Sequence, residues 1–298
     1  MNYLKRTTNQ VIAIIASVIL IFGLGSCEQE VEQQEDRTIR MVYANWSEGV
    51  AMTHLTAEIL EQHLGYTVDL KMTDVESVFK HLSQGEYDVF VDAWLPVTHN
   101  AYLEQYGNEL DDLGINVEKV QTGLVVPDYV NINTISELDA VADTIYGIGA
   151  GAGVMEGTKQ AIKVYNLSAH LKTGNEQSMT TKLMEAVKRR EPVVITGWTP
   201  HWMSNRLNLK FLEDSQNVYG DSEQIHTIAR DEFTNDHPYA ALFFERFELN
   251  EKQLGSLMDE LQAFPNNERR AVRNWMDENE ILINKWIRGL EPQREKIM

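Results

Sequence analysis

Residues 88–96 read DVFVDAWLP, a nearly continuous apolar run that ends at Pro96. Runs of this kind are typical of strands that are buried on both faces of a parallel sheet. The stretch therefore predicts a central strand, and the segments on either side of it decide which kind of fold contains that strand.

Upstream of this strand, the chain alternates between strand-like and helical patterns. Apolar residues at spacings of three and four predict two helices, and each ends at a glycine, Gly65 and Gly85. The predicted strands are 38–46 and 66–72, and the predicted helices are 50–64 and 76–84. Alternation of strands and helices is typical of an α/β fold.

Downstream, the alternation continues and then gives way to helices. The predicted strands are 119–127, 143–149, 193–198 and 224–230, the predicted helices are 155–165 and 179–189, and residues 233–298 are helical throughout. In that helical end, Trp275 and Trp286 have the spacing of core anchors.

A break after Pro127 indicates that the chain crosses there into a second lobe, and the strand at 224–230 indicates its return. We therefore expect lobe I to contain residues 38–126 plus 226–298 and lobe II to contain residues 127–225. Pockets favour domain interfaces and the carboxyl ends of strands in α/β sheets. A cleft between the two lobes meets both conditions.

The first residues predict export. Lys5 and Arg6 precede a short apolar run and then the sequence Leu-Gly-Ser-Cys, so residues 1–26 have the features of a lipoprotein-type signal peptide. Cys27 is the only cysteine and cannot form an internal disulfide, which makes it a free thiol or a point of lipid attachment. An uncleaved membrane anchor is the alternative. The polar residues 27–37 predict a tether, and the folded part is expected outside the cytoplasm.

Composition excludes several classes of function. The 298 residues carry a formal charge of −19, which argues against nucleic acid or an anionic bilayer surface as the main partner. The chain has no Gly-x-Ser-x-Gly elbow, no His-Glu-x-x-His zinc motif and no Walker loop. We therefore expect a protein that is not an enzyme and that uses no metal and no cofactor.

Three predicted strands end in tryptophan: Trp46, Trp94 and Trp198. A buried tryptophan usually serves the core, but three rings at carboxyl strand ends would face the same cleft. Indole faces carry negative electrostatic potential and attract a bulky, weakly hydrated cation, with roughly 0.5 to 2 kcal/mol for each contact. The pattern predicts a site for a quaternary ammonium group.

A glycine-rich segment offers a place for the other end of such a ligand. YGIGAGAGVMEG (146–157) follows a predicted strand and opens a helix, so its backbone N–H groups can converge on an anion. The segment also fits a loose dinucleotide fingerprint, but no acid is clearly placed at the end of a second strand, and the chain is exported. His99, five residues after Trp94, is the expected side-chain donor to a carboxylate.

These motifs resemble a known family. ANWSEGVAMTH, DVFVDAWLPVTHNAY, GLVVPDYV, GIGAGAGVMEG and VVITGWTPHWM, followed by LKFLED, are similar to the glycine betaine-binding proteins of the OpuAC type, the extracytoplasmic receptors of ABC importers for compatible solutes. The resemblance covers nearly the whole mature chain. It implies an α/β fold of the two-lobed periplasmic-binding-protein (Venus flytrap) type, in which each lobe is a mostly parallel sheet flanked by helices and two crossover strands connect the lobes.

The resemblance also implies the site. Three tryptophans form a prism around the trimethylammonium group, and two backbone N–H groups and a histidine hold the carboxylate. In this sequence the prism is Trp46, Trp94 and Trp198, the backbone donors are Gly153 and Val154, and the histidine is His99. Trp202 and His201 belong to the same signature and are expected to support the loop. Ser47 stands where relatives often have aspartate, which affects the rim of the pocket.

The leading hypothesis is a receptor that is lipid-anchored at Cys27, closes around glycine betaine and presents it to an ABC permease in the membrane. Other quaternary or sulfonium solutes remain alternatives: choline, carnitine and proline betaine. A sugar-binding module and an exported enzyme are further alternatives. Choline has no carboxylate, so dependence of binding on His99 separates it from glycine betaine.

Overall fold

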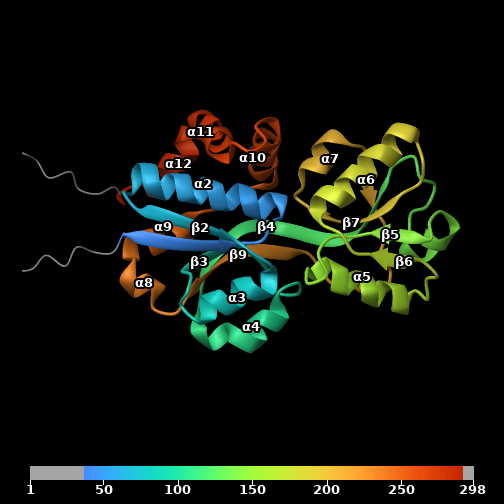
Figure 1. Ribbon diagram of the computed structural model, residues 1–298, viewed down its shortest axis with the longest axis horizontal. Coiled ribbons are helices and arrows are strands. Elements are labelled where there is room, and N and C mark those ends of the chain that lie inside the picture. Colours follow the sequence, from blue (N-terminus) through green and yellow to red (C-terminus); the bar gives the residue numbers. More distant parts are fainter. Residues whose placement is uncertain (1–36, 291–298) are drawn as a thin grey trace, which may run out of the picture. The chain divides into compact units, whose positions relative to one another are not determined.

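The computed structural model describes residues 37–290 (Figure 1). The predicted signal peptide, Cys27 and nearly all of the predicted tether lie outside these residues. Within residues 37–290, no helix has the length and apolar character needed to cross a membrane.

The first sheet contains β1 (Thr38–Tyr43), β2 (Thr67–Met72), β3 (Val89–Leu95), β4 (Leu110–Pro127) and β9 (Glu223–Arg230). Their spatial order is β2-β1-β3-β9-β4. β1 pairs in parallel with β2 and β3, whereas β9 is antiparallel to both β3 and β4. Four strands therefore run in one direction and β9 runs against them. All seven residues of β3 are buried, as the apolar run at 88–96 predicts.

A second sheet continues from the same long strand, β4. The first part of β4, up to Val120, pairs with β9, and the part from Gln121 pairs with β7 (Val194–Thr199) and β8 (Leu209–Phe211). β5 (Thr144–Tyr146) pairs in parallel with β7 and with β6 (His170–Lys172). Here β4 is the strand that runs against the others. Each sheet is therefore mostly parallel, with one opposed strand: β9 in the first sheet and β4 in the second.

Helices cover both faces of the first sheet (Figure 1). α2 (Ser47–His63) contacts β1, β2 and β3, and α3 (Val75–Ser83) contacts β1, β3 and β9 from the opposite face, where α4 (Asn100–Tyr106) packs beside it. Among the C-terminal helices, α10 (Glu251–Ala263) and α11 (Glu268–Glu278) pack on α2, and α9 (Pro238–Arg246) packs along β4. α8 (Phe233–Asp236) and α12 (Glu280–Ile287) pack against α9. Trp275 and Trp286 are buried in this layer, as their spacing predicts.

The second sheet also lies between helices. α5 (Gly153–Val164) contacts β4, β6 and β7, and α6 (Glu176–Arg189) contacts β7 from the other face (Figure 1). α6 begins at a capping box in which Asn175 and Ser178 exchange hydrogen bonds. The short helix α7 (Trp202–Arg206) contacts α10 of the C-terminal layer. Two short 3₁₀ helices, η1 (Gly107–Glu109) and η2 (Ile135–Ala140), complete the described elements.

The strand and helix alternation matches the expectation from sequence, but some limits differ. β1 ends at Tyr43, so the first tryptophan, Trp46, lies in the turn that leads into α2 and not at the end of the strand. β4 begins at Leu110, nine residues before the expected start at 119, because its first half pairs with β9. α4, β6 and β8 are not expected from the sequence. α4 has no buried residue and the two strands have three residues each, so apolar periodicity is weak in all three.

The lobe limits expected from the sequence, 38–126 plus 226–298 and 127–225, stay a prediction. Within β4 the pairing partner changes between Val120 and Gln121, and the return strand β9 begins at Glu223. The described residues, 37–290, all belong to one compact unit.

A buried ion cluster ties three strands of the first sheet together. The carboxylate of Asp88, which is 1% exposed, accepts hydrogen bonds from Arg40 Nη2 and from Arg230 Nε, each at 2.7 Å. Burial raises the pKa of Asp88, but the hydrogen bonds from the two arginines outweigh this effect and lower the pKa overall. Asp88 therefore stays ionised and joins β1 and β9 beside the start of β3.

Candidate ligand-binding site

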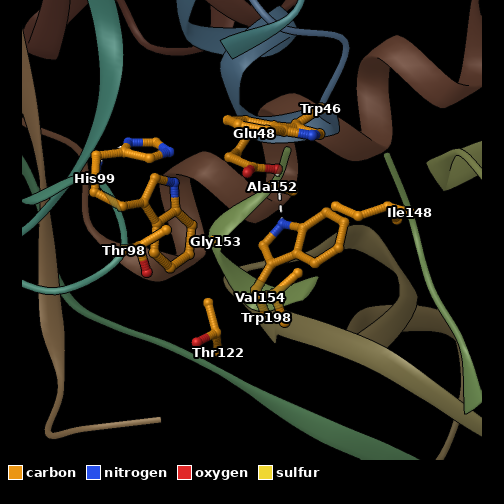
Figure 2. A pocket seen from close by; sticks show the side chains of 11 residues that line it. Trp46, Glu48, Thr98, His99, Thr122, Ile148, Ala152, Gly153, Val154 and Trp198 are labelled. Atoms are coloured by element: carbon orange, nitrogen blue, oxygen red, sulfur yellow. Dashed lines mark hydrogen bonds between the residues drawn. The ribbon is translucent and has the colours of Figure 1, made fainter. Parts of the chain in front are cut away.

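A cavity of about 290 Å³ lies where the carboxyl ends of strands from both sheets meet. Its lining comes from the start of α2, the end of β3, the loop after β3, the middle of β4, the start of α5 and the end of β7 (Figure 2): Trp46, Glu48, Trp94, Thr98, His99, Thr122, Ile148, Ala152, Gly153, Val154 and Trp198.

All three tryptophans singled out in the sequence line this cavity. Trp94 and Trp198 are almost completely buried, and Trp46 is half-buried. Figure 2 shows the rings of Trp46 and Trp198 on different sides of one space, with His99 facing the same space. The tertiary structure thus brings together three rings that are distant from one another in the chain, in an arrangement that suits a cation with an apolar surface.

Each of the two buried rings is held by a carboxyl group at its N–H edge. Trp198 Nε1–H donates to Glu48 Oε2 at 2.8 Å, and Trp94 Nε1–H donates to Asp92 Oδ1 at 3.0 Å. These hydrogen bonds fix the rotation of both indoles. Each indole then keeps a fixed surface towards the cavity that it lines.

His99 presents a neutral N–H donor. Its Nδ1 accepts the backbone N–H of Trp94 at 2.9 Å, so the ring proton is assigned to Nε2. Nε2 is buried and has no hydrogen-bond partner among the described residues. Burial lowers the pKa of His99 to about 3, so the imidazole is neutral at physiological pH. A buried donor without a partner is costly, and a ligand acceptor in the cavity would satisfy it.

The glycine-rich turn brings the first turn of α5 against the His99 loop. α5 begins at Gly153, and no side chain caps its first turn. A Cβ at Gly153 would lie 2.9 Å from the carbonyl oxygen of Thr98, so only glycine permits this approach. The backbone N–H groups at the start of the helix and the His99 imidazole therefore border the same cavity, where a helix N-terminus favours negative charge.

The chain matches the family model described as the substrate binding domain of the ABC-type glycine betaine transport system, over residues 37–278. The chain belongs to this family. Its members are substrate-binding proteins of transport systems, and the two-lobed α/β fold expected from the sequence is confirmed by solved relatives.

Two solved structures and one curated protein are informative relatives. Lactococcal OpuAC, in its closed-liganded conformation complexed with glycine betaine, has a TM-score of 0.81 and 33% identity, covering 85% of this chain and 100% of that chain. ProX from Borrelia burgdorferi, a glycine betaine/L-proline-binding protein, has a TM-score of 0.80 and 30% identity, covering 86% and 97%. The glycine betaine/carnitine transport binding protein GbuC of Listeria monocytogenes is 39% identical over 168 residues. That match spans about half of each chain, 53% of this one and 56% of the relative.

Behind the cavity of this substrate-binding domain, Ser47 connects elements of the two sheets. The backbone N–H of Ser47 donates to Glu176 Oε2 at 2.9 Å, and its hydroxyl donates to the other oxygen of the same carboxylate. Trp202 Nε1–H donates to Ser47 Oγ at 3.2 Å, so Trp202 packs behind the site and is not among the lining residues. His201 Nδ1 accepts the N–H of Met203, and its Nε2 donates to Glu176 at 3.2 Å.

Glu176 is the ionised centre of this second group. Burial raises its pKa, but the hydrogen bonds from His201 and Ser47 outweigh burial and lower it. Because Ser47 starts α2 and Glu176 starts α6, the bond joins the two helix beginnings across the site.

Glu223 is a positioning residue that the sequence did not reveal. It lies at the start of β9, is 1% exposed, and its Oε2 accepts the backbone N–H groups of Val97 and Thr98 at 2.9 and 2.7 Å. Its Oε1 accepts the Thr98 hydroxyl. The carboxylate therefore fixes the loop that carries His99.

Glu48 and Glu176 were also missed by sequence reasoning. Each stands in the first turn of a helix, where acids are common on exposed surfaces, so the local pattern gave no signal of burial. For Glu48, only its position two residues after Trp46 could have drawn attention to it.

Proposed function

We propose that this chain is the extracytoplasmic receptor of an ABC importer and that it captures glycine betaine in the cavity between the two sheets. The observation that carries the proposal is the meeting of three tryptophan rings, a neutral histidine N–H and a helix N-terminus around one small cavity. One end of this cavity suits a cation without N–H groups, and the other suits a carboxylate.

At the cationic end, Trp46, Trp94 and Trp198 surround the trimethylammonium group. Cation–π contacts of roughly 0.5 to 2 kcal/mol each would together contribute a few kcal/mol. No lysine or arginine is among the described residues that line the cavity, whereas Glu48 is. The charge of the lining supports a cation at this end.

At the carboxylate end, His99 Nε2–H and the backbone N–H groups of Gly153 and Val154 act as donors. His99 stays neutral and so donates one directed hydrogen bond without bringing a buried charge. Thr98 packs against Gly153 and keeps both donor groups next to each other.

Ligand binding would stabilise the closed arrangement because the ligand contacts elements of both sheets. Trp46, Trp94 and His99 belong to the first sheet and its connections, and Trp198 and Gly153 to the second. A ligand shifts such an equilibrium by its differential affinity for the two states. The closed form is then the species that an ABC permease would recognise.

Lipid attachment at Cys27 completes the proposal and rests on the signal-peptide pattern of residues 1–26. It places the receptor on the outer side of the cytoplasmic membrane or in the periplasm. Expression in bacteria that are fed a labelled fatty acid tests it: the wild type should carry the label, and a Cys27→Ser variant should not.

Isothermal titration with glycine betaine tests the assignment of the ligand. Glycine betaine should bind, and Trp198→Ala should weaken it at least tenfold, whereas Trp275→Phe in the C-terminal helices should not change it. Choline, carnitine and proline betaine belong in the same panel, and carnitine is supported by the name of the Listeria relative. Tighter binding of one of them would assign the receptor to that solute. Binding of sugars, with no betaine bound, would overturn the proposal.

A further inference from the structure

Two buried carboxyl groups hold the tryptophan rings of the cavity, and neither is explained by the binding of a carboxylate ligand. Glu48 is 2% exposed and accepts the indole N–H of Trp198, and Asp92 is fully buried and accepts that of Trp94. Glu48 itself lines the cavity. Glu48 therefore lies at the end of the cavity that suits a cation, and Asp92 lies behind it, bonded to the lining residue Trp94.

Asp92 packs against the start of α2, at the residue that follows Glu48. A Cβ at Gly49, the residue after Glu48, would lie 3.1 Å from Asp92 Cγ and would overlap its Oδ2, so only glycine fits between the helix start and this carboxyl group. Asp92 Oδ2 is buried and has no hydrogen-bond partner among the described residues. Burial of an ionised oxygen without a partner is unfavourable, and protonation removes the cost.

The surrounding charges favour protonation of the pair before ligand binds. Burial raises the pKa of Glu48 well above its usual value, and repulsion from Asp92 and Glu176 raises it further. Burial likewise raises the pKa of Asp92, with a smaller contribution from Glu176. Of the other titratable groups around the site, His201 is bonded to Glu176, and His99 is neutral. No basic side chain among the described lining residues offsets the two acids.

We propose that one of the two carboxyl groups, Glu48 or Asp92, is protonated before the solute binds and releases its proton when a quaternary ammonium group enters the cavity. The O–H bond of the protonated carboxyl breaks, the proton passes to the buffer, and the solute is chemically unchanged. The positive charge of the solute takes the place of the proton. The receptor thus exchanges a proton for a cation, and this inference rests on the proposed capture of a quaternary ammonium solute.

The sign of the pH effect follows from this exchange. The bound cation favours the ionised form of the pair, so binding releases protons and the affinity rises with pH. Where a full proton is released, Kd falls by up to about tenfold for each pH unit. His99 does not contribute between pH 5 and 8, because its pKa of about 3 keeps it neutral there.

Calorimetry in two buffers measures the released proton directly. The full-length protein, in mild detergent, is titrated with glycine betaine and separately with choline at one pH, in phosphate and in Tris, which differ in ionisation enthalpy. The difference between the observed binding enthalpies gives the number of protons released. We expect release of up to about one proton with each solute that binds, and a Kd that falls as the pH is raised from 5 to 8.

Matched variants assign the proton to the pair. Glu48→Gln and Asp92→Asn keep the side-chain length and an oxygen that accepts the indole N–H, and thermal melting checks that each variant folds. Each should abolish the buffer-dependent enthalpy and flatten the pH dependence of Kd, whereas Glu185→Gln on the exposed side of α6 should keep both.

Three outcomes would overturn the proposal. If a solute binds with the same enthalpy in both buffers, proton exchange is wrong while the proposed function stands. If proton release persists in both pair variants, another group supplies the proton and the assignment is wrong. If neither solute binds, the proposed function and the proton exchange fail together.

Discussion

Replacement of His99 by asparagine tests the contribution of the ligand carboxylate to binding separately from that of the quaternary ammonium group. The imidazole Nε2–H is buried and has no other partner among the described residues, so a ligand carboxylate would be its acceptor. Hydrogen bonds to charged groups contribute about 1.5 to 3 kcal/mol. We therefore expect His99→Asn to weaken the binding of glycine betaine by about 10- to 100-fold, since each 1.4 kcal/mol of binding free energy is a factor of ten in Kd.

Choline is the matched ligand for this experiment, because it keeps the quaternary ammonium group and has no carboxylate. Its affinity should change less than threefold in the variant, as estimated from the unchanged cation–π contacts. Asparagine retains an oxygen that can accept the backbone N–H of Trp94, which limits damage to the loop. His170→Asn, at an exposed histidine of β6, is the control for substitution itself. Equal weakening of both ligands, or undiminished affinity for glycine betaine, would refute the role of His99 as the carboxylate donor.

The stability of the His99→Asn variant should depend less on pH than the stability of the wild type. The pKa of His99 is lowered from its usual value to about 3 in the folded protein, so the unfolded chain binds more protons between about pH 6.5 and 3. His99 therefore lowers the stability of the wild type as pH falls through this window, by up to about 1.4 kcal/mol per pH unit. Urea titration at pH 7 and pH 5 should show a smaller acid loss in His99→Asn than in the wild type, and an equal loss would contradict the buried neutral histidine.

Three further predictions concern the cage, the His99 loop and the fold. Trp198→Ala should weaken the binding of glycine betaine and of choline alike, by at least tenfold, because the cavity loses one wall and ring contacts of roughly 0.5 to 2 kcal/mol. Fluorescence titration measures both affinities. Selective loss of binding to one ligand would argue against a shared cage. Glu223→Gln should weaken the binding of glycine betaine more than that of choline, because the loop that carries His99 loses a carboxylate that accepts three hydrogen bonds. An equal loss of affinity for both ligands in calorimetry would count against a positioning role. Asp88→Asn should lower the free energy of unfolding by about 3 kcal/mol. This value is at the low end of the range for removing one partner of a buried ion pair, because Arg40 is partly exposed. The lowered pKa of Asp88 means that its contribution is present near neutral pH and is lost as pH falls through the folded-state pKa. Denaturation curves of the wild type and variant should therefore converge in acid, and curves that stay parallel would refute this.

Local patterns were sufficient for most of the secondary structure. The buried run at β3 and the apolar spacing of α2, α3, α5 and α6 report burial directly, because strands and helices repeat with periods of two and 3.6 residues. Short exposed elements such as β6 and α4 bury little apolar surface and so leave no periodic signal. The early start of β4 was missed because it depends on pairing with β9, which is more than 90 residues away in the sequence.

Local sequence specifies which side chains are available to the site: tryptophans after apolar strands, a glycine-rich helix start, and His99 close enough to Trp94 to form a local hydrogen bond. The groups that support these side chains come from distant parts of the chain and are fixed by the fold. Glu48 reaches Trp198 across 150 residues, Ser47 reaches Glu176 across 129, and Glu223 reaches Thr98 across 125. Periodicity describes which face of an element is apolar, but it carries no information on which distant elements meet there. The burial of Glu48 and Glu176, and with it the altered pKa of each, exists only once both sheets have closed around them.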